Sequence, residues 1–372
     1  DIHGSASSTA SGPSATLLSK LQSTATAVWL DSVESLSGGT VNQGRMGLAD
    51  HLRGAVAQAA QAKLPGVALF VVYNLPNRDC GAGASAGKLL GSAGLDTYKH
   101  QYIDIIAQTV SSAAYKDLRV VFIVEPDSLP NMVTNAAVPA CATVKSQGLY
   151  VDGVTYAVST LGALPNVTLY LDIAQSAWLG WPSNMMEAVP LYLQVLKGAA
   201  AGAAAVRGFV TNVSNYIPLQ EPYLSAADTT TLGDTFYSSN PCFDELSYVK
   251  ALSAQFSAAG LPNMHFLTDT SRNGWAPIHD GKPIDRRPLR SDWCNVKDAG
   301  LGERPQASPA LWSGYDAFVW VKPPGESDGP SLAGSSCDPA NAQLDTMAEA
   351  PAAGAWFTAG LSSMAQNATP AL

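Results

Sequence analysis

Seven short apolar segments recur along the chain, and they constrain the fold more than any other feature. They are rich in β-branched and aromatic residues and nearly continuous in hydrophobicity, as strands covered on both faces are. Each segment ends in a polar side chain. The segments are 27–31 (AVWLD), 68–74 (ALFVVYN), 120–127 (VVFIVEPD), 168–172 (TLYLD), 208–212 (GFVTN), 265–269 (HFLTD) and 318–322 (FVWVK).

Helical patterns lie between these segments, for example at 50–63, 98–115 and 242–260, the last ending with Gly260 in a capping position. Strands and helices alternate at intervals of roughly 35 to 55 residues, which leaves room for a crossover each time. The pattern predicts an α/β fold with a parallel sheet. Seven polar strand ends converging at one edge favour closure into a barrel over an open sheet.

The length of 372 residues would suit two average domains, but large α/β barrels reach this size as one domain. Residues 1–16 are small and polar, and are expected to form a flexible arm or linker remnant. No other low-complexity stretch and no internal repeat divides the remainder. A single domain is therefore predicted over residues 17–372.

The charge and composition favour a secreted protein with a neutral surface. Charged residues make up 14% of the chain, against about 25% in ordinary soluble proteins. The net charge of −9 argues against binding nucleic acid or an anionic membrane. The chain starts at Asp1 rather than Met, as expected of a mature product without its leader. The most apolar stretch, 189–206, contains Gln194 and Lys197 and is expected to be a packed helix, not a membrane span.

The cysteines predict two disulfides and one free thiol. No CxxC pair and no histidines at zinc-finger spacing accompany them, so no metal site and no cofactor is expected. Three Asn-x-Ser/Thr sequons, at Asn166, Asn212 and Asn367, are of the kind that a secreted chain can use for glycosylation. The cysteines are Cys80, Cys141, Cys242, Cys294 and Cys337.

Carboxylates gather after two neighbouring strands. The segment 120–135 (VVFIVEPDSLPNMVTN) ends a buried strand with Glu125 and Asp127, although burying an ionised carboxylate is costly unless it is paired. The segment 73–94 carries Asp79 and Ser85. It lacks the GxxxxGK[ST] pattern and no helix is expected to start in it, so a long mobile loop over a groove is favoured over a phosphate cradle.

Asp79 and Asp127 follow neighbouring strands and are expected to face each other. Two close carboxylates do not both ionise easily, so one pKa rises and that group can donate a proton. This is the chemistry of glycosidic bond cleavage. In the alternative interpretation Asp79 only pairs with Arg78, and Asp127 only caps the helix that follows.

Tryptophans on or just beyond the strand ends favour a saccharide ligand, because the apolar faces of sugar rings stack on indoles. The alternative, ordinary core packing, suits Trp320 inside its predicted strand better than the pair in the loop-like segment 178–182 (WLGWP). A serine hydrolase is disfavoured because no Gly-x-Ser-x-Gly elbow is present. The tryptophans are Trp29, Trp178, Trp181, Trp293 and Trp320.

From about residue 27 to the C-terminus, the sequence resembles family 6 glycoside hydrolases of the fungal cellobiohydrolase type. Two signatures carry the resemblance: 71–87 (VVYNLPNRDCGAGASAG) and 121–130 (VFIVEPDSLP). The resemblance implies a distorted seven-stranded β/α barrel and inverting hydrolysis of β-1,4-glucan. Supporting blocks are 170–182 (YLDIAQSAWLGWP), 211–216 (TNVSNY), 292–296 (DWCNV), 318–329 (FVWVKPPGESDG) and 354–357 (GAWF).

The resemblance assigns the proton donor to Asp127, and Asp79 is expected to raise its pKa and stabilise charge. Tyr73 would press on the distorted sugar, and Ser85 would help to hold the attacking water. Asp328 occupies the position proposed as general base, acting through a water chain. Alternatively, Asp328 is a member of a structural salt bridge near Arg272 and Lys322. The glucose-binding positions implied are Trp29, Asp31, Asp172, Gln175, Trp178, Trp181, Asn215, Trp293, Lys322 and Glu326.

The resemblance also pairs Cys80 with Cys141 and Cys294 with Cys337, which leaves Cys242 free, and it expects Glu125 to support the barrel by hydrogen bonding. The sequence departs from the family pattern at several positions, and no cellulose-binding module or long linker is seen. The departures are Gln175 in place of histidine, Asn74 and Asn77 in place of aspartate, and Ser327 in place of cysteine.

Loops of nearly full length after Lys322 and Cys80 favour release of cellobiose from the non-reducing ends of cellulose by a monomeric, secreted enzyme. Within the family, the alternative is an endo-acting glucanase with a more open cleft. From other classes, the alternatives are a non-catalytic glucan-binding protein, which would lack Asp127 or Asp79, and a metal-dependent hydrolase, for which no ligand cluster is apparent.

Overall fold

The computed structural model describes residues 13–221, 240–279, 281–283 and 285–372. Most of the arm predicted at 1–16 lies outside these residues, except that the helix α2 (Pro13–Ser19) begins within it. The chain divides into two compact units. We call residues 27–173 and 186–210 the β1–β5 unit, and residues 1–26, 174–185 and 211–372 the β6–β12 unit.

Five parallel strands form the sheet of the β1–β5 unit, and each pairs with the next along the chain. They correspond to the first five predicted segments, so the parallel α/β prediction is confirmed. Their polar residues follow at the carboxyl ends, on one edge of the sheet. The strands are β1 (Val28–Leu30), β2 (Val67–Val72), β3 (Arg119–Val124), β4 (Val167–Asp172) and β5 (Gly208–Thr211).

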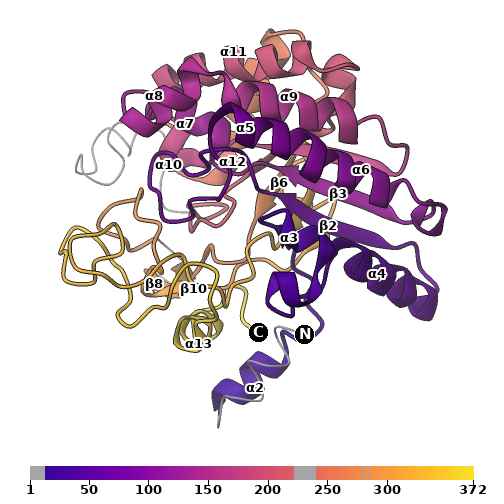
Figure 1. Ribbon diagram of the computed structural model, residues 1–372. Coiled ribbons are helices and arrows are strands. Elements are labelled where there is room, and N and C mark those ends of the chain that lie inside the picture. The colour runs from indigo at the N-terminus through magenta and orange to yellow at the C-terminus, as the bar shows by residue number, and fades with distance from the viewer. Residues whose placement is uncertain (1–12, 222–239, 280, 284) are drawn as a thin grey trace. The chain divides into compact units, whose positions relative to one another are not determined.

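Helices make the crossovers between these strands, and Figure 1 shows α5, α6, α9 and α11 along one side of β2 and β3. The prediction at 73–94 was wrong in one respect, because α5 begins inside that segment at Gly91. The helical elements are α3 (Glu34–Ser37), η1 (Gly39–Asn42), α4 (Leu48–Ala62), α5 (Gly91–Thr97), η2 (Tyr98–Ile103), α6 (Asp104–Val110), η3 (Ala113–Tyr115), α7 (Ser128–Thr134), α8 (Pro139–Ser146), α9 (Leu149–Leu161), α11 (Pro182–Gly198) and η4 (Gly202–Ala205).

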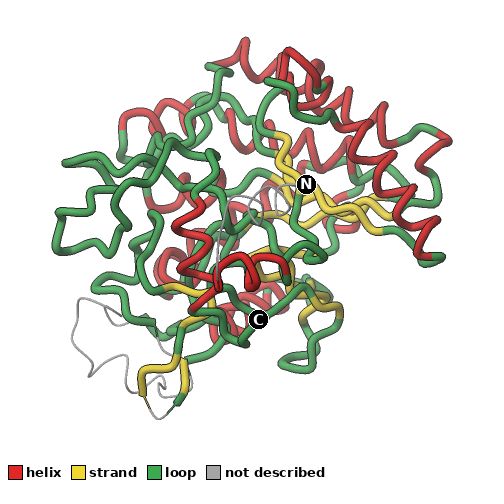
Figure 2. The backbone as a smooth tube through the Cα atoms, turned by 90° about the horizontal axis from the view of Figure 1, so that it is seen from below, coloured by secondary structure: helices red, strands yellow, loops and turns green. Residues whose placement is uncertain are grey.

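The β6–β12 unit contains the remaining strands. β6 and β12 pair in parallel, β11 lies antiparallel beside β12, and two further pairs, β7–β10 and β8–β9, are antiparallel. Figure 2 shows how much of the chain is loop, and residues 320–357 contain no helix and no strand. The elements are α10 (Ser176–Leu179), α12 (Glu245–Ala258), β6 (His265–Asp269), β7 (Gly274–Trp275), β8 (Pro277–His279), β9 (Lys282–Pro283), β10 (Ala299–Gly300), β11 (Gln306–Ala307), β12 (Tyr315–Val319) and α13 (Thr358–Gln366).

The last predicted strand is displaced, because β12 ends at Val319 instead of residue 322. The backbone N–H groups of Val321 and Lys322 donate to the carboxylate of Asp269 at 3.1 and 3.0 Å, and these contacts replace the pairing of a strand. Trp320 follows the strand and is buried in the core of this unit, as the core interpretation expected.

α12 begins three residues later than the start of its predicted segment. Asp244 caps it by accepting a hydrogen bond from the N–H of Ser247 at 2.7 Å. At the other end Gly260 adopts φ +90°, and the N–H of Leu261 donates to the carbonyl of Phe256 at 2.8 Å. This is the glycine-terminated helix end that the sequence predicted.

Two of the three sequon asparagines are buried. The Nδ2 of Asn166 donates to the carbonyl of Tyr115 at 3.1 Å, and that of Asn212 donates to the carbonyl of Asp269 at 2.9 Å. A glycan on either amide would displace these contacts, so their use as glycosylation sites is incompatible with the folded structure. Asn367 is partly exposed.

Glu125 ends β3 inside the core, where its carboxylate accepts from the N–H groups of Asn74 at 3.0 Å and Leu75 at 3.3 Å. These two bonds join the ends of β2 and β3. Burial nevertheless raises the pKa of Glu125 from 4.5 to about 7, because the charged form loses its hydration.

We expect the thermal stability to fall as the pH rises from 4.5 to 7. The raised pKa of Glu125 favours folding when the group is protonated, so this contribution is present below pH 4.5 and is lost as the pH passes 7, at roughly 3 kcal/mol. Glu125→Gln should flatten this part of the dependence of the melting temperature on pH. Glu34→Gln, on the surface, is the control, and an unchanged slope in Glu125→Gln would contradict the assignment.

Candidate functional site

Asp127 is held after β3 in the left-handed region, at φ +63°, and its N–H donates to Oδ2 of Asp172 at 2.9 Å. It occupies the N-cap position of α7, but its side chain makes no capping hydrogen bond. The helix-capping alternative therefore does not account for this carboxylate. The side chain is left available for chemistry.

The pKa of Asp127 is raised well above its ordinary value. Burial is the largest cause, and the negative charges of Asp172 and Asp79 add to it. The raised pKa favours the protonated form of Asp127, and this form is the one that can act as an acid.

Asp79 lies in the loop between β2 and α5, also in the left-handed region at φ +58°. Its Oδ2 accepts from the N–H of Ser85 at 2.7 Å, so the two predicted site residues are in direct contact. Burial raises the pKa of Asp79, while hydrogen bonds from the backbone N–H groups of Ser85, Ala82 and Gly83 oppose the rise.

The loop that carries Asp79 is closed at its base. Asn77 donates its N–H to the carbonyl of Leu89 at 2.8 Å, and its Oδ1 accepts from the N–H of Gly91 at 2.8 Å. Tyr150, in α9, donates its hydroxyl to the carbonyl of Asn77 at 2.7 Å. The disulfide between Cys80 and Cys141 ties the same loop to α8. Asn77 thus has a structural task, because its hydrogen bonds close the base of the loop that carries Asp79.

Arg78 is a positioning residue that the sequence did not single out. Its guanidinium donates to the carbonyls of Asp31 at 2.7 Å and Ser85 at 2.8 Å, and also to that of Tyr73. It lies over the Tyr73 ring, 4.2 Å from the centroid. The ion pair with Asp79 that the alternative required is absent among the described contacts. One side chain therefore joins three predicted site segments.

Tyr73 is buried, and its ring meets that of Trp29 edge to face with centroids 5.1 Å apart. Asp31 lies beyond Trp29 at the end of β1 and forms a partly exposed ion pair with Arg45 at 3.5 Å. The predicted residues Trp29, Asp31 and Tyr73 are thus brought together at the ends of β1 and β2.

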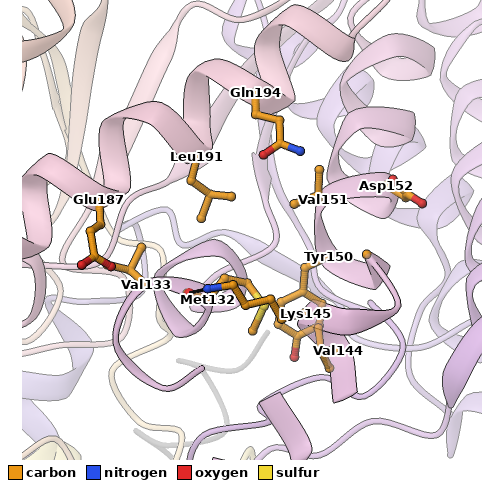
Figure 3. A pocket seen from close by; sticks show the side chains of 11 residues that line it. Met132, Val133, Val144, Lys145, Tyr150, Val151, Asp152, Glu187, Leu191 and Gln194 are labelled. Atoms are coloured by element: carbon orange, nitrogen blue, oxygen red, sulfur yellow. Dashed lines mark hydrogen bonds between the residues drawn. The ribbon is translucent and has the colours of Figure 1, made fainter. Parts of the chain in front are cut away.

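A cavity of about 280 Å³ opens among α7, α8, α9 and α11 of the same unit. Figure 3 shows its lining, with Lys145, Asp152, Glu187 and Gln194 around apolar side chains. None of the predicted catalytic side chains lines it. Tyr150 does, and its hydroxyl supports the base of the Asp79 loop.

In the β6–β12 unit, Asp328 is buried in an ion pair. Its Oδ2 accepts from Nη1 of Arg272 at 2.9 Å, from the hydroxyl of Tyr216 at 2.8 Å and from the N–H of Asn295 at 2.9 Å. Although burial opposes it, the negative charge of Asp328 raises the pKa of Arg272. The salt-bridge interpretation of Asp328 is therefore seen in the structure, while its action as a base stays a prediction.

The side chain of Asn295 forms hydrogen bonds on both sides of the peptide unit that follows Asp328 in the chain and holds Asp328 in place. Its Oδ1 accepts from the N–H of Asp328 at 3.0 Å, and its Nδ2 donates to the carbonyl of Gly329 at 2.9 Å. The disulfide between Cys294 and Cys337 lies next to it. Ser327 is buried and donates to the carbonyl of Pro351 at 2.8 Å.

Asp269 is a second residue whose importance was missed. Besides Val321 and Lys322, its carboxylate accepts from the N–H groups of Ser214 and Ser271, both at 3.0 Å. The four bonds fix the loops that carry Asn215 and Lys322. The polar end of the predicted strand was visible in the sequence, but the partners of Asp269 were not.

The other predicted glucose-binding residues also lie in this unit. Gln175 is buried and caps α10 by accepting from the N–H of Ala177 at 2.6 Å, so its side chain is engaged locally. Lys322 and Glu326 lie 3.6 Å apart as an ion pair. The Oδ1 of Asn215 is buried without a hydrogen bond among the described residues. Trp178, Trp181 and Trp293 are partly exposed.

Within the described residues, no group of three or more histidine, cysteine, aspartate or glutamate side chains is arranged to hold a metal ion. Cys242 is buried and outside both disulfides, and burial raises its pKa to about 12. In the same part of the chain, no helix has the length and apolar character needed to cross a bilayer.

We expect Arg78→Lys to loosen the loop of residues 77–91, because one ammonium group cannot reach three carbonyls in the geometry of a guanidinium. Hydrogen exchange of the Gly83 and Ser85 amides should accelerate by about tenfold, the equivalent of one lost hydrogen bond. Mass spectrometry of peptides from this loop measures it. Lys88→Ala, which removes only an exposed ion pair with Glu34, is the control, and equal exchange in both variants would refute the role of Arg78.

Comparison with known proteins agrees with this geometry. The sequence profile of the glycosyl hydrolases family 6 matches residues 3–368, across both units. Exoglucanase A of Cellulomonas fimi is 40% identical over 93% of this chain, which spans 44% of that protein's length. The probable 1,4-beta-D-glucan cellobiohydrolase C of Aspergillus niger is 39% identical over 95% of this chain and 72% of its own length.

Among solved structures, the catalytic domain of Cellulomonas fimi Cel6B matches all of this chain and 92% of its own, with a TM-score of 0.91 and 38% identity. The similarity extends over both units, so the fold is the α/β fold of that catalytic domain. The extra strand β11 and the short pairs β7–β10 and β8–β9 add to the seven predicted strands. By sequence profile, identity and fold together, the chain belongs to family 6 of the glycosyl hydrolases.

Proposed function

We propose that this chain is a secreted, monomeric hydrolase that cleaves β-1,4-glucan with inversion and releases cellobiose from the non-reducing ends of cellulose. The observation that carries the proposal is the carboxyl group of Asp127. Burial and the charges of Asp172 and Asp79 raise its pKa well above the ordinary value, which favours the protonated form. A neutral carboxylic acid that does not cap its helix is what protonation of a glycosidic oxygen requires.

In the proposed reaction Asp127 gives its proton to the oxygen of the leaving glucan, and the bond from that oxygen to the anomeric carbon breaks. Positive charge then develops on the ring that stays behind. The carboxylate of Asp79 stabilises this charge, and Tyr73 presses on the distorted ring. Ser85, held by Asp79, helps to place the water that attacks the anomeric carbon from the opposite face.

The attacking water must lose a proton, and Asp328 is the proposed acceptor, through other waters. The ion pair with Arg272, at 2.9 Å, fixes the position of its carboxylate. All three donors reach Oδ2, so Oδ1 has no hydrogen bond from a described residue and can accept one from water.

Glucose units are proposed to bind through stacking and through hydrogen bonds to their hydroxyls. The partly exposed indoles offer apolar faces, and Oδ1 of Asn215 offers an acceptor that has no other partner among the described residues. The names of relatives, an exoglucanase and a 1,4-beta-D-glucan cellobiohydrolase, support exo action. The long loop after Lys322, fastened by the Cys294–Cys337 disulfide, also supports exo action.

Asp127→Asn should lower the rate of cellohexaose hydrolysis by about 10² to 10⁴, because the amide cannot donate the proton in the same way. NMR of the first products from the parent enzyme should show cellobiose as the α-anomer. Asp152→Asn, on the exposed face of α9, is the matched control and should keep full activity. The β-anomer, or an active Asp127→Asn variant, would overturn the mechanism, and early mixed products would overturn exo action.

Asp172→Asn should shift the upper pH limit of kcat/KM downward by about one unit or more. Activity requires protonated Asp127 and is lost as the pH rises through its pKa, which the charge of Asp172 raises. Removing that charge lowers this pKa, while the amide oxygen can still accept from the N–H of Asp127. The pH profile on a soluble cello-oligosaccharide measures the shift, and an unmoved limit would contradict the electrostatic coupling.

A further inference from the structure

Ser176, the first residue of α10, is held at three atoms by side chains that are distant in the sequence. Its N–H donates to Oε1 of Glu245 at 2.8 Å, and its carbonyl accepts from Nδ2 of Asn240 at 2.7 Å. Its hydroxyl oxygen accepts from Nη2 of Arg290 at 2.7 Å. Ser176, Asn240 and Glu245 have no exposed surface, and Arg290 is 2% exposed.

The segment fastened in this way carries two of the proposed glucose-binding indoles. α10 spans only Ser176–Leu179, and a helix of one turn is not stable by itself. Trp178 lies within it and Trp181 follows it. At Gly180 an added Cβ would lie 2.2 Å from the carbonyl oxygen of Ser176, so the turn between the indoles has no spare room. Their orientation therefore depends on the contacts of Ser176.

Arg290 joins this segment to a second one. It lies three residues before Trp293, in the loop that leads to the Cys294–Cys337 disulfide. Its Nη1 donates to the carbonyl of Cys242 at 3.3 Å. Burial raises the pKa values of Glu221 and Glu245, and the charge of Arg290 opposes both rises, so these buried carboxylates offset part of the cost of burying the guanidinium. The hydrogen bond to Ser176 is the contact that connects this charge cluster to α10.

We propose that Arg290 is a positioning residue for glucan binding, which acts through Ser176 to fix the Trp178 segment relative to the Trp293 loop. The inference rests on the proposed function, since it assumes that these indoles bind glucose units. Stacking on a sugar ring requires a defined indole orientation, and small displacements of positioned groups weaken binding strongly. Arg290 itself touches no substrate.

Arg287 provides a matched control in the same loop. It is 3% exposed, and its guanidinium forms a buried ion pair with Asp285 and donates to the carbonyl of Asp292 at 2.6 Å. It makes no hydrogen bond to α10. A general effect of disturbing a buried arginine should appear equally in Arg287→Lys, whereas an effect transmitted through Ser176 should not.

The test compares Arg290→Lys, Ser176→Ala and Arg287→Lys by steady-state kinetics on cellotriose and cellohexaose, and by quenching of tryptophan fluorescence with cellohexaose. We expect Arg290→Lys and Ser176→Ala each to raise KM for cellohexaose about tenfold, the equivalent of one charge-assisted hydrogen bond, with kcat within about twofold. The increase should be smaller on cellotriose. Combining the two substitutions should add little, because both remove the same contact.

Equal increases in KM for Arg287→Lys and Arg290→Lys would overturn the proposal, as would an unchanged KM in Ser176→Ala. Ser176→Ala removes a single oxygen at a helical position that alanine suits, so it keeps the test valid if Arg290→Lys does not fold. A parent enzyme that neither binds nor cleaves cello-oligosaccharides would refute the proposed function itself. If the parent enzyme binds and cleaves cello-oligosaccharides but the variants have the same KM as the parent, only the role of Arg290 is refuted.

Discussion

The desolvation of carboxylates at the ends of parallel strands is the constraint on which the site of the β1–β5 unit depends. Glu125, Asp127 and Asp172 all lie at or just after β3 and β4, yet the chain treats them differently. Glu125 receives two backbone N–H groups and joins strand ends. Asp172 accepts the N–H of Asp127 and supplies negative charge beside it. No described residue donates a hydrogen bond to the carboxyl group of Asp127, and its raised pKa favours the protonated form. Asp127 is suited to act as an acid because backbone N–H groups donate to the carboxylates of Glu125 and Asp172 and not to its own carboxyl group.

In the β6–β12 unit, the buried carboxylates are instead surrounded by hydrogen-bond donors. Asp269 is surrounded by four backbone N–H groups, and Asp328 by a guanidinium, a hydroxyl and an N–H group. Burial raises the pKa of Asp269, and the hydrogen bonds from backbone N–H groups oppose this rise because they favour the charged form. Donors thus surround these carboxylates, whereas the side chain of Asp127 makes no capping hydrogen bond.

The sequence predicted the elements of the fold because hydrophobic runs and helix periodicity are local properties. It also placed Asp79 and Asp127 at the ends of adjacent strands, since strand order followed from the crossovers. It did not indicate the roles of Arg78, Asp269 or Arg290, because their partners come from segments that only folding brings together. The end of β12 was predicted too late for the same reason. Trp320 and Val321 continue the apolar pattern, but the N–H of Val321 donates to the carboxylate of Asp269 and not to a neighbouring strand. Likewise, a sequon does not reveal that Asn212 is buried.

The backbone around the carboxylates suggests how the donors are aimed. Non-glycine residues with positive φ gather just beyond the ends of β2 to β5, and each such residue carries strain of about 1–3 kcal/mol. In a strand, N–H groups alternate in direction and pair with the neighbouring strands. A left-handed residue interrupts this alternation, so its N–H group can donate to a side chain instead. The N–H of Asp127 reaches Asp172 from such a residue, and that of Ser214 reaches Asp269 from another. The hydrogen bonds to carboxylates offset the strain, so the same contacts that set the charges also fix the loops. These residues are Asn77, Asp79, Glu125, Asp127, Ala174, Asn212 and Ser214.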